Sequence, residues 1–412
     1  MKLKKACSRR EFLGKTLAGV AGAGLLGLNR LESRQKSAPA TAATAATATL
    51  ITRTLGKTGM RMPIVSMGVM NADLPALVQR AYELGIRQFD TAAGYQRGRN
   101  EEMVGRVIQE LGARDKVFIA TKIMVPEVRQ RLTQAQAKAK YLELLEASLK
   151  RLRTDYVDIV YIHDVSNVKD VSDPGLLEGM AAAKKQGKTR AAGFSTHQNM
   201  GPCLVEAMKG GGHDVVLTTY NYSLHPYPEL LDTMKKAAAS GIGLVAMKTQ
   251  CQQDWYREEL PAELQAYYQG TIRHSALLKW VMNYDCFTTA VPGFTTFDQL
   301  QEDIVCASSL AYSPLEKKFL EDRKVKLAIA SACRQCGECA ATCPRGADIP
   351  SLMRVHMYAF SYGNPVQARE TLENSSGGRG LEACRDCGSC RASCSGRVGL
   401  SRRIDQLKQV YA

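Results

Sequence analysis

Four ionisable side chains stand where short apolar runs end, at points where a strand would stop and turn. Asp90 ends one run and Tyr95 follows it five residues later, while Lys122 and His163 each end a further run. A phenol has a pKa of about 10, so it becomes a better acid only beside a cation. A lysine held charged by a carboxylate supplies that cation, and an imidazole can hydrogen-bond a carbonyl. The four groups therefore suit protonation of a carbonyl oxygen while hydride reaches the carbon.

Strand-length apolar runs alternate with stretches of helical period and must place these groups. The runs predict strands at 64–68, 87–91, 117–122, 157–163, 189–195, 215–220, 243–248 and 287–292. Apolar residues at i, i+3 and i+4 within 141–149 are typical of the helices between them. Eight such units in about 250 residues predict a (β/α)8 TIM barrel, whose chemistry lies at the carboxyl ends of the strands. A doubly wound open sheet is the alternative, but no G-x-G-x-x-G follows the first run.

The same residues resemble motifs of the aldo-keto reductase family over residues 55–303. The resemblance is carried by Phe89-Asp90-Thr91-Ala92 with Tyr95, by Thr121-Lys122, by 145–152 and by His163. It implies reduction of an aldehyde or ketone, a sugar-derived one included, or oxidation of the alcohol, by hydride transfer with a nicotinamide cofactor. It also implies that Tyr95 is the proton donor and that Asp90, Lys122 and His163 complete the catalytic group.

The resemblance further implies cofactor contacts at several strand ends. These residues are Gly68, Val69, Met70, Asp90, Ser195, Thr196, Met247, Lys248, Pro292, Gly293, Phe294, Thr295, Gln299, Glu302 and Asp303. Thr196 replaces the usual Asn, Leu217 stands where Gln is common, and Met247 stands where an aromatic residue often stacks. Gly293 and Gln299 replace the cations that would bind a 2′-phosphate, so the sequence does not decide between NADP and NAD. An ordinary barrel loop and helix start is the alternative interpretation of 291–303.

Eight of the thirteen cysteines form a doubled pattern near the C-terminus. The spacing Cys-x-x-Cys-x-x-Cys-x-x-x-Cys places thiols at 333, 336, 339 and 343 and again at 384, 387, 390 and 394. This pattern resembles bacterial two-cluster ferredoxins, in which the fourth cysteine of each run ligates the other cluster. The resemblance assigns one 4Fe-4S cluster to Cys333, Cys336, Cys339 and Cys394, and the second to Cys384, Cys387, Cys390 and Cys343. Zinc sites or disulfides are the alternatives. Cys203, Cys286 and Cys306 are expected to be core thiols.

The N-terminus resembles a twin-arginine signal, with Arg9-Arg10 before an apolar run over 17–28. A chance basic start is the alternative. The predicted organisation is a signal peptide over 1–40, an Ala/Thr linker over 41–50, a barrel over 51–312, a connecting helix over 313–330, and a small ferredoxin-like α+β or α domain over 331–412. These features predict export in the folded state to a bacterial periplasm.

The net charge of +15 does not by itself indicate nucleic-acid binding, because nine Lys and Arg fall within residues 1–36. The expected partners are a small carbonyl or alcohol substrate, a redox partner protein and the twin-arginine export machinery, with membrane contact only through an uncleaved signal. Trp255 and Tyr256 suggest an aromatic wall suited to ring compounds, with Cys251 nearby as pocket lining. The alternative function is an iron–sulfur electron-transfer or redox-sensing module whose barrel is a docking platform, since hydride moves two electrons and a cluster accepts one.

Overall fold

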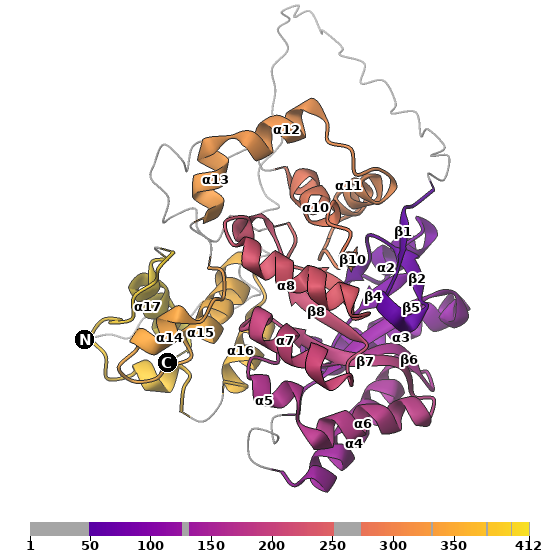
Figure 1. Ribbon diagram of the computed structural model, residues 1–412, viewed down its shortest axis with the longest axis horizontal. Helices are drawn as coiled ribbons and strands as arrows, with labels where there is room; N and C mark the ends of the chain where they lie inside the picture. The colour runs from indigo at the N-terminus through magenta and orange to yellow at the C-terminus, as the bar shows by residue number, and fades with distance from the viewer. Residues whose placement is uncertain are drawn as a thin grey trace, which may run out of the picture. The chain divides into compact units, whose positions relative to one another are not determined.

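The computed structural model describes residues 49–125, 132–250, 273–330, 333–375, 378–396 and 398–411, and side chains at 327–330 are excluded. Eight strands form one parallel sheet that curls into a nearly closed barrel (Figure 1). In order they are β3 (Met67–Gly68), β4 (Gln88–Asp90), β5 (Phe118–Ile123), β6 (Val157–Ile162), β7 (Thr189–Thr196), β8 (Val215–Thr219), β9 (Gly243–Met247) and β10 (Phe287–Ala290). A parallel bridge from Val65 to Ala290 joins the first strand region to the last. The predicted (β/α)8 barrel is confirmed.

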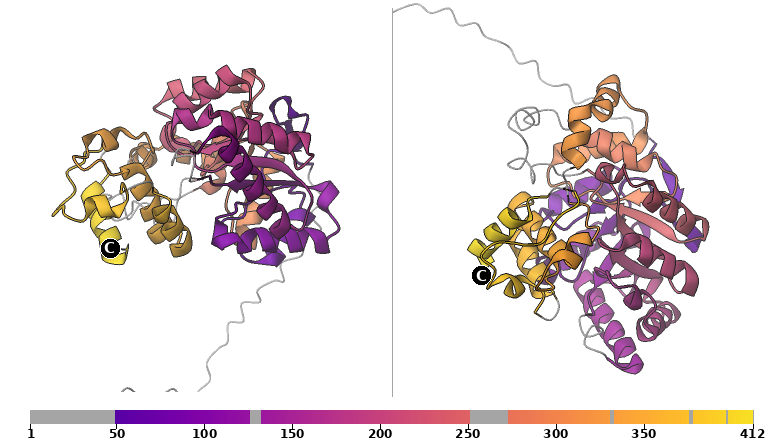
Figure 2. Two further views of the ribbon diagram at one scale, coloured as in Figure 1. Left: turned by 90° about the horizontal axis from the view of Figure 1, so that it is seen from below. Right: turned by 60° about the vertical axis from the view of Figure 1, so that its left-hand side comes forward.

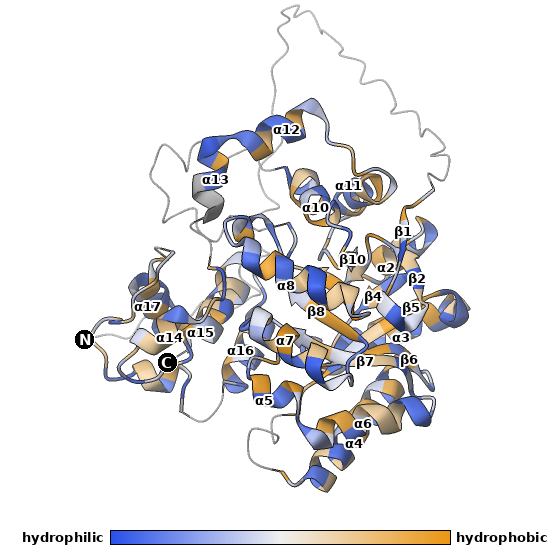
Figure 3. Cartoon of the chain, viewed as in Figure 1, coloured by the Kyte–Doolittle hydropathy of each residue, from blue (hydrophilic) through white to orange (hydrophobic). Residues whose placement is uncertain are grey.

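A hairpin precedes the barrel and fills one end of its interior. It consists of β1 (Thr52–Thr54) and β2 (Arg61–Pro63), which pair antiparallel. Leu55, Met60 and Met62 are almost fully buried with inward-facing strand residues such as Tyr161 and Val245. Apolar side chains are thus removed from water on both sides of the strands, and Figure 3 shows β8 as strongly hydrophobic.

Helices follow the strands and pack around the sheet, as the views in Figure 2 also show. They are α2 (Pro75–Glu83), α3 (Arg99–Glu110), α4 (Gln134–Leu152), α5 (Val168–Val171), α6 (Pro174–Lys185), α7 (Met200–Gly210), α8 (Pro228–Ala239), α10 (His274–Met282) and α11 (Phe297–Ser308). The longest, α4, begins at a capping box in which Thr133 and Gln136 satisfy each other's backbone N–H groups. It ends at Arg153, which adopts a left-handed conformation. Local sequence therefore fixes both ends of this helix.

The stretch 313–330 holds two helices where the sequence predicted one connecting helix. These are α12 (Pro314–Glu321) and α13 (Arg323–Ala330). Asp322 between them has φ −64° and ψ 122°, an extended conformation that breaks the helical hydrogen bonding. The single-helix expectation is therefore wrong at this residue.

The C-terminal residues form a module with its own apolar core. Its elements are α14 (Glu338–Thr342), α15 (Ile349–His356), the π-helical turn η7 (Met357–Ser361), α16 (Pro365–Glu373), η8 (Leu381–Cys384) and α17 (Leu400–Tyr411). Leu352, Met353, Ile404 and Leu407 are among its buried residues. All of its described elements are helical. Barrel and module belong to one compact unit, Thr47–Ala412. Among the described residues no helix is both long and apolar enough to cross a membrane.

Candidate active site and metal centres

Asp90, Lys122 and His163 lie at the carboxyl ends of three neighbouring strands, β4, β5 and β6. The Lys122 ammonium donates to Asp90 Oδ1, to the Thr91 carbonyl at 2.7 Å and to the Tyr95 hydroxyl at 3.3 Å. The rings of Tyr95 and His163 meet edge-on with centroids 6.0 Å apart. The structure therefore brings all four sequence-predicted groups to one place.

Tyr95 begins the short turn η2 (Tyr95–Gly98), which leads into α3. Gln96 and Arg97 in this turn have φ of 52° and 56°, so the chain doubles back tightly after the tyrosine. The buried Asn100 fixes the loop, because its side chain accepts from the Thr91 hydroxyl at 2.7 Å and donates to the Val69 carbonyl at 2.8 Å. Asn100 is thus a residue that supports the Tyr95 loop and that the sequence-based predictions do not include.

The electrostatics of Tyr95 differ from the sequence-based expectation. Burial raises the pKa of Tyr95 well above 10, and the carboxylates of Asp90, Glu370 and Asp164 raise it further. Contrary to the expectation from the sequence, Lys122 does not bring this pKa below its ordinary value at rest, because burial disfavours the phenolate and Asp90 neutralises the ammonium. Tyr95 is therefore a neutral phenol that keeps its proton at rest.

The imidazole of His163 is also neutral. Burial lowers the pKa of His163 to about 3, and the positive charges of Lys122, Arg354 and Lys248 act in the same direction. A neutral imidazole carries one N–H and one acceptor nitrogen, so it can still donate a hydrogen bond to a carbonyl oxygen.

The C-terminal module contributes side chains to this site, which the sequence did not reveal. Arg354 on α15 donates from Nη2 to Asp164 Oδ2 at 2.6 Å, and Asp164 directly follows His163. The Lys248 ammonium lies 3.4 Å from the Tyr358 hydroxyl of η7 and 4.8 Å from the centre of its ring. Glu370 on α16 lies so close to Gly94, beside Tyr95, that a Cβ there would collide with its carboxyl. Arg354 and Tyr358 are one helical turn apart in the sequence. This spacing is the sequence feature that could have indicated that the two side chains share one face of a helix.

Several predicted cofactor residues lie at the ends of β7 and β9. Ser195 is buried, and its hydroxyl accepts from the Asp164 N–H at 3.0 Å. The Thr196 hydroxyl donates to the Gln198 carbonyl at 2.7 Å, so it is turned toward the backbone. Met247 ends β9 at 9% exposed, and Lys248 has a left-handed φ of 56° with its ammonium at the module.

A second group surrounds the meeting point of β3 and β10. Gly68 donates its N–H to the Pro292 carbonyl at 2.9 Å, and a Cβ at Gly68 would come within 2.9 Å of the Val291 carbonyl. Gly293 is exposed, and a Cβ there would lie 3.9 Å from the Gly68 carbonyl, so these two glycines line the same edge. Val69 and Phe294 are buried, whereas Met70 packs against the core of the module.

Most of the predicted cofactor residues at the start of α11 already have hydrogen-bond partners within the protein. Gln299 Oε1 accepts from the Thr295 N–H at 2.8 Å, and Glu302 Oε1 accepts from the Ser275 N–H at 3.2 Å. Asp303 Oδ1 accepts from Gln250, but its buried Oδ2 has no hydrogen-bond partner among the described residues. Burial raises the pKa of Asp303 well above its ordinary value. An orphaned polar atom at this edge fits a site that a polar ligand completes.

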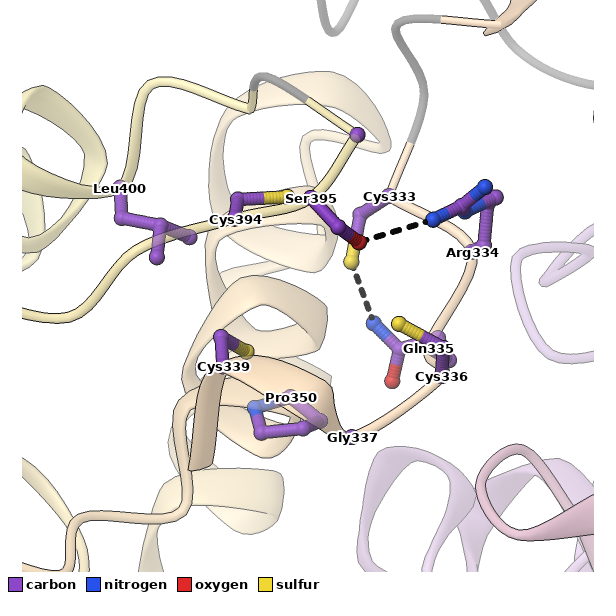
Figure 4. A pocket seen from close by; sticks show the side chains of 11 residues that line it. Cys333, Arg334, Gln335, Cys336, Gly337, Cys339, Pro350, Cys394, Ser395 and Leu400 are labelled. Atoms are coloured by element: carbon purple, nitrogen blue, oxygen red, sulfur yellow. Dashed lines mark hydrogen bonds between the residues drawn. The ribbon is translucent and has the colours of Figure 1, made fainter. Parts of the chain in front are cut away.

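Cysteines from both runs line one cavity in the module (Figure 4). Cys333, Cys336 and Cys339 of the first run lie there with Cys394, the last of the second run. Gln335 donates from Nε2 to Cys333 Sγ at 3.3 Å, and Arg334 crosses to the Ser395 hydroxyl at 3.0 Å. Four thiols around one cavity are the donor set that a 4Fe-4S cluster requires.

The remaining four cysteines form the second group. The buried Cys384 belongs to the core of the module, Cys343 and Cys390 pack against that core, and the Cys387 N–H donates to the Cys384 carbonyl at 3.1 Å. The eight cysteines of the two runs are free thiols in the structure. Within the described ranges no group of three or more His, Cys, Asp or Glu side chains is placed so that it could hold a single metal ion. Ligands of a four-iron cube bind different iron atoms, so they need not converge on one point.

Comparison with known proteins agrees with both parts. Residues 59–259 match the Aldo/keto reductase family. Methylglyoxal reductase DkgB of Salmonella typhimurium is 34% identical over 208 residues, which cover 50% of this chain and 72% of the relative. The chain belongs to the aldo/keto reductase family. The Escherichia coli O157:H7 methylglyoxal reductase DkgB is 30% identical over 244 residues, covering 59% of this chain and 85% of the relative. Residues 332–398 match a 4Fe-4S dicluster domain.

A solved member of the aldo/keto reductase family has the same fold. AKR11C1 from Bacillus halodurans, in its holo form, aligns with a TM-score of 0.54 at 19% identity, covering 68% of this chain and all of the other. The prediction of an aldo-keto reductase-like NAD(P)-dependent oxidoreductase is thus confirmed as an enzyme class, and the chain carries a 4Fe-4S dicluster domain. The twin-arginine signal, Cys251, Trp255 and Tyr256 lie outside the described residues.

Proposed function

We propose that the barrel reduces an aldehyde or ketone, or oxidises the corresponding alcohol, by hydride transfer with NADPH or NADH and with Tyr95 as the proton donor. The observation that carries this proposal is the contact of Lys122 with both Asp90 and the Tyr95 hydroxyl, beside His163. Relatives of this chain include proteins named methylglyoxal reductase and L-glyceraldehyde 3-phosphate reductase, which are carbonyl reductases by name.

His163, Tyr95 and Lys122 have different roles at the carbonyl oxygen. The nicotinamide, when bound, supplies the hydride to the carbonyl carbon. Neutral His163 donates a hydrogen bond that holds the oxygen near the Tyr95 hydroxyl. As negative charge develops on that oxygen it becomes more basic than a phenolate, and the Tyr95 proton moves to it. The Lys122 ammonium, 3.3 Å away, then stabilises the phenolate until a solvent proton restores the phenol.

The residues for the nicotinamide nucleotide fit only in part. Ser195 and Met247, with the glycine-lined edge at Gly68 and Gly293, support nucleotide binding at the ends of β7, β9, β3 and β10. Gln299 brings no positive charge to a 2′-phosphate and is occupied with Thr295. Both NADPH and NADH are therefore the appropriate probes.

We infer two 4Fe-4S clusters in the module, one held by Cys333, Cys336, Cys339 and Cys394 and the other by Cys384, Cys387, Cys390 and Cys343. The cavity lined by both runs supports the first set. For residues 1–40 the proposal remains a twin-arginine signal that sends the folded, cluster-loaded protein to the periplasm.

The test is the variant Tyr95→Phe in full-length protein purified without oxygen, with methylglyoxal and glyceraldehyde 3-phosphate as substrates. Loss of a general acid should lower kcat about 10²- to 10⁴-fold. Binding of NADPH or NADH, followed by fluorescence titration, should stay at the wild-type level. Wild-type turnover by Tyr95→Phe would refute the proton donor. A wild-type protein that binds neither nucleotide and turns over neither substrate would refute the proposed function.

A further inference from the structure

The wall of the active site that the module supplies contains a buried arginine with unused donors. Arg354 is only 3% exposed. Its Nη2 donates to Asp164 at 2.6 Å and to the Ser351 hydroxyl at 3.2 Å. Its Nη1 has no hydrogen-bond partner within the described part of the chain. A guanidinium carries five N–H donors, and leaving buried donors unmatched costs free energy, so this position favours an additional acceptor.

The charges around this arginine leave a positive excess. Three cations gather here, Lys122, Lys248 and Arg354, whereas Asp90 pairs with the first and Asp164 with the last. Lys248 forms no ion pair among the described residues and lies instead over the Tyr358 ring. Arg354 contacts Asp164, the residue after His163, and Lys248 contacts Tyr358, one helical turn from Arg354, so the two cations lie on the same wall of the site. An excess of one positive charge is matched by a single monoanion.

The arginine is held in place by both parts of the protein. Asp348 caps the start of α15 by accepting from the Ser351 N–H at 3.2 Å. The Ser351 hydroxyl in turn accepts from Gln198 of the barrel at 3.1 Å. Because Asp164 and Ser351 fix the Nη2 edge, the Nη1 edge is preorganised and little rotamer entropy remains to be lost on binding an anion.

We propose that Arg354, with Lys248 beside it, binds a carboxylate of the substrate, so that the preferred substrates are carbonyl compounds that carry a carboxylate group. The proposal rests on the carbonyl reduction proposed above, since His163 next to Asp164 marks where the carbonyl lies. Arg354 would then determine substrate specificity, and it belongs to the C-terminal module rather than to the barrel. The carboxyl of Glu370, which lies against Gly94 beside Tyr95, limits the site to one anion when it is ionised.

The experiment compares matched substrates that differ only in the carboxylate. Succinic semialdehyde is paired with butanal, and glyoxylate with acetaldehyde, using full-length, anaerobically purified wild type and Arg354→Gln. The variant should lower kcat/KM for the carboxylates about 10- to 150-fold, which is the loss expected when a hydrogen bond to a charged group is removed. The ratio of kcat/KM for each carboxylate to kcat/KM for its neutral partner should fall by a factor in the same range. Arg369→Gln, which removes an exposed arginine of α16, is the matched control and should alter neither class.

Binding of a non-reacting monocarboxylate separates this proposal from the proposed function. Butyrate should bind wild type, measured by titration calorimetry, and should bind Arg354→Gln at least about tenfold more weakly. Iron content and visible absorption of the variant verify that the module is intact, and Arg354→Lys should restore part of the carboxylate preference. If wild type reduces none of the aldehydes, carbonyl reduction fails while the butyrate titration still decides the subsite.

Three results would overturn the carboxylate subsite. One is an equal loss of kcat/KM for charged and neutral aldehydes in Arg354→Gln. Another is butyrate binding by that variant as tight as by wild type. The third is a loss confined to glyceraldehyde 3-phosphate relative to glyceraldehyde, which would identify the bound anion as a phosphate.

Discussion

The variant Glu370→Gln should flatten the dependence of stability on pH. Glu370 lies against Gly94, and its buried Oε2 has no hydrogen-bond partner among the described residues. Burial and, secondly, the charge of Glu373 raise the pKa of Glu370 from its ordinary value of 4.5 to about 7. A carboxyl in this environment is stable in its neutral form, and ionising it costs free energy.

The sign follows from comparing folded and unfolded chains. Below pH 4.5 both states hold the proton on Glu370 and its full contribution to stability is present. Between 4.5 and about 7 the unfolded chain loses that proton while the folded chain keeps it, so stability falls as pH rises. Above about 7 the contribution is lost. At about 1.4 kcal/mol for each unit of pKa, the whole effect is about 3 kcal/mol at most, and partial exposure of the side chain reduces it.

Urea unfolding between pH 5.5 and 8 measures this effect. The full-length, cluster-loaded protein is unfolded under argon, followed by far-UV circular dichroism and by the visible absorption of the clusters. Glutamine does not titrate, so the difference in unfolding free energy between wild type and Glu370→Gln should change by about 2 kcal/mol or less across this range, in favour of the variant at high pH.

Glu373→Gln is the control, because it makes the same charge change at an exposed position of the same helix. In this variant stability should still fall as pH rises, and the fall should end at a slightly lower pH, since Glu373 helps to raise the pKa of Glu370. Parallel curves for wild type and Glu370→Gln over the whole range would show that Glu370 is ionised normally, and the described packing of α16 on Gly94 would then be wrong.

Two further predictions concern the barrel and the clusters. Gly193→Ala would place a Cβ against the Val215 carbonyl between β7 and β8, so it should lower the melting temperature by an amount equivalent to about 1–3 kcal/mol. The control is Gly210→Ala, because Gly210 has open space around it. This variant should leave the melting temperature within about two degrees of wild type or raise it. Cys394→Ser should remove roughly half of the bound iron, the cluster of the first run, as measured by iron analysis and electron paramagnetic resonance; unchanged iron content would contradict the proposed ligand sets.

The barrel and the convergence of its proposed catalytic residues were predictable because their signals are local. Apolar runs of strand length predict the eight strands, and Lys122 and His163 are the last residues of two of those runs. Parallel strands in a closed barrel must deliver such residues to the same rim. The cysteine pattern is also local, since the spacing of thiols around a cluster is set by the cluster's own dimensions.

The module's side of the site could not be predicted in the same way. Arg354 contacts Asp164 across 190 positions of sequence, and Glu370, which lies between the two cysteine runs, packs against Gly94. Nothing within a window of one helix shows which distant loop such a side chain will meet. The same distant packing reversed the expected shift of the Tyr95 pKa, because burial and added carboxylates outweigh the single ammonium considered from sequence.

The helix α15 links one proposed cluster to the proposed substrate subsite. Pro350, in its first turn, lines the cavity of Cys333, Cys336, Cys339 and Cys394, and Arg354 follows one turn later, about 6 Å along the axis. Ligation of a metal centre by residues distant in sequence orders the chain around it, and part of the binding free energy becomes folding free energy. A cluster in this cavity would therefore hold α15 where Arg354 meets Asp164. That role requires no electron exchange with the barrel, which removes the conflict between two-electron hydride transfer and one-electron clusters.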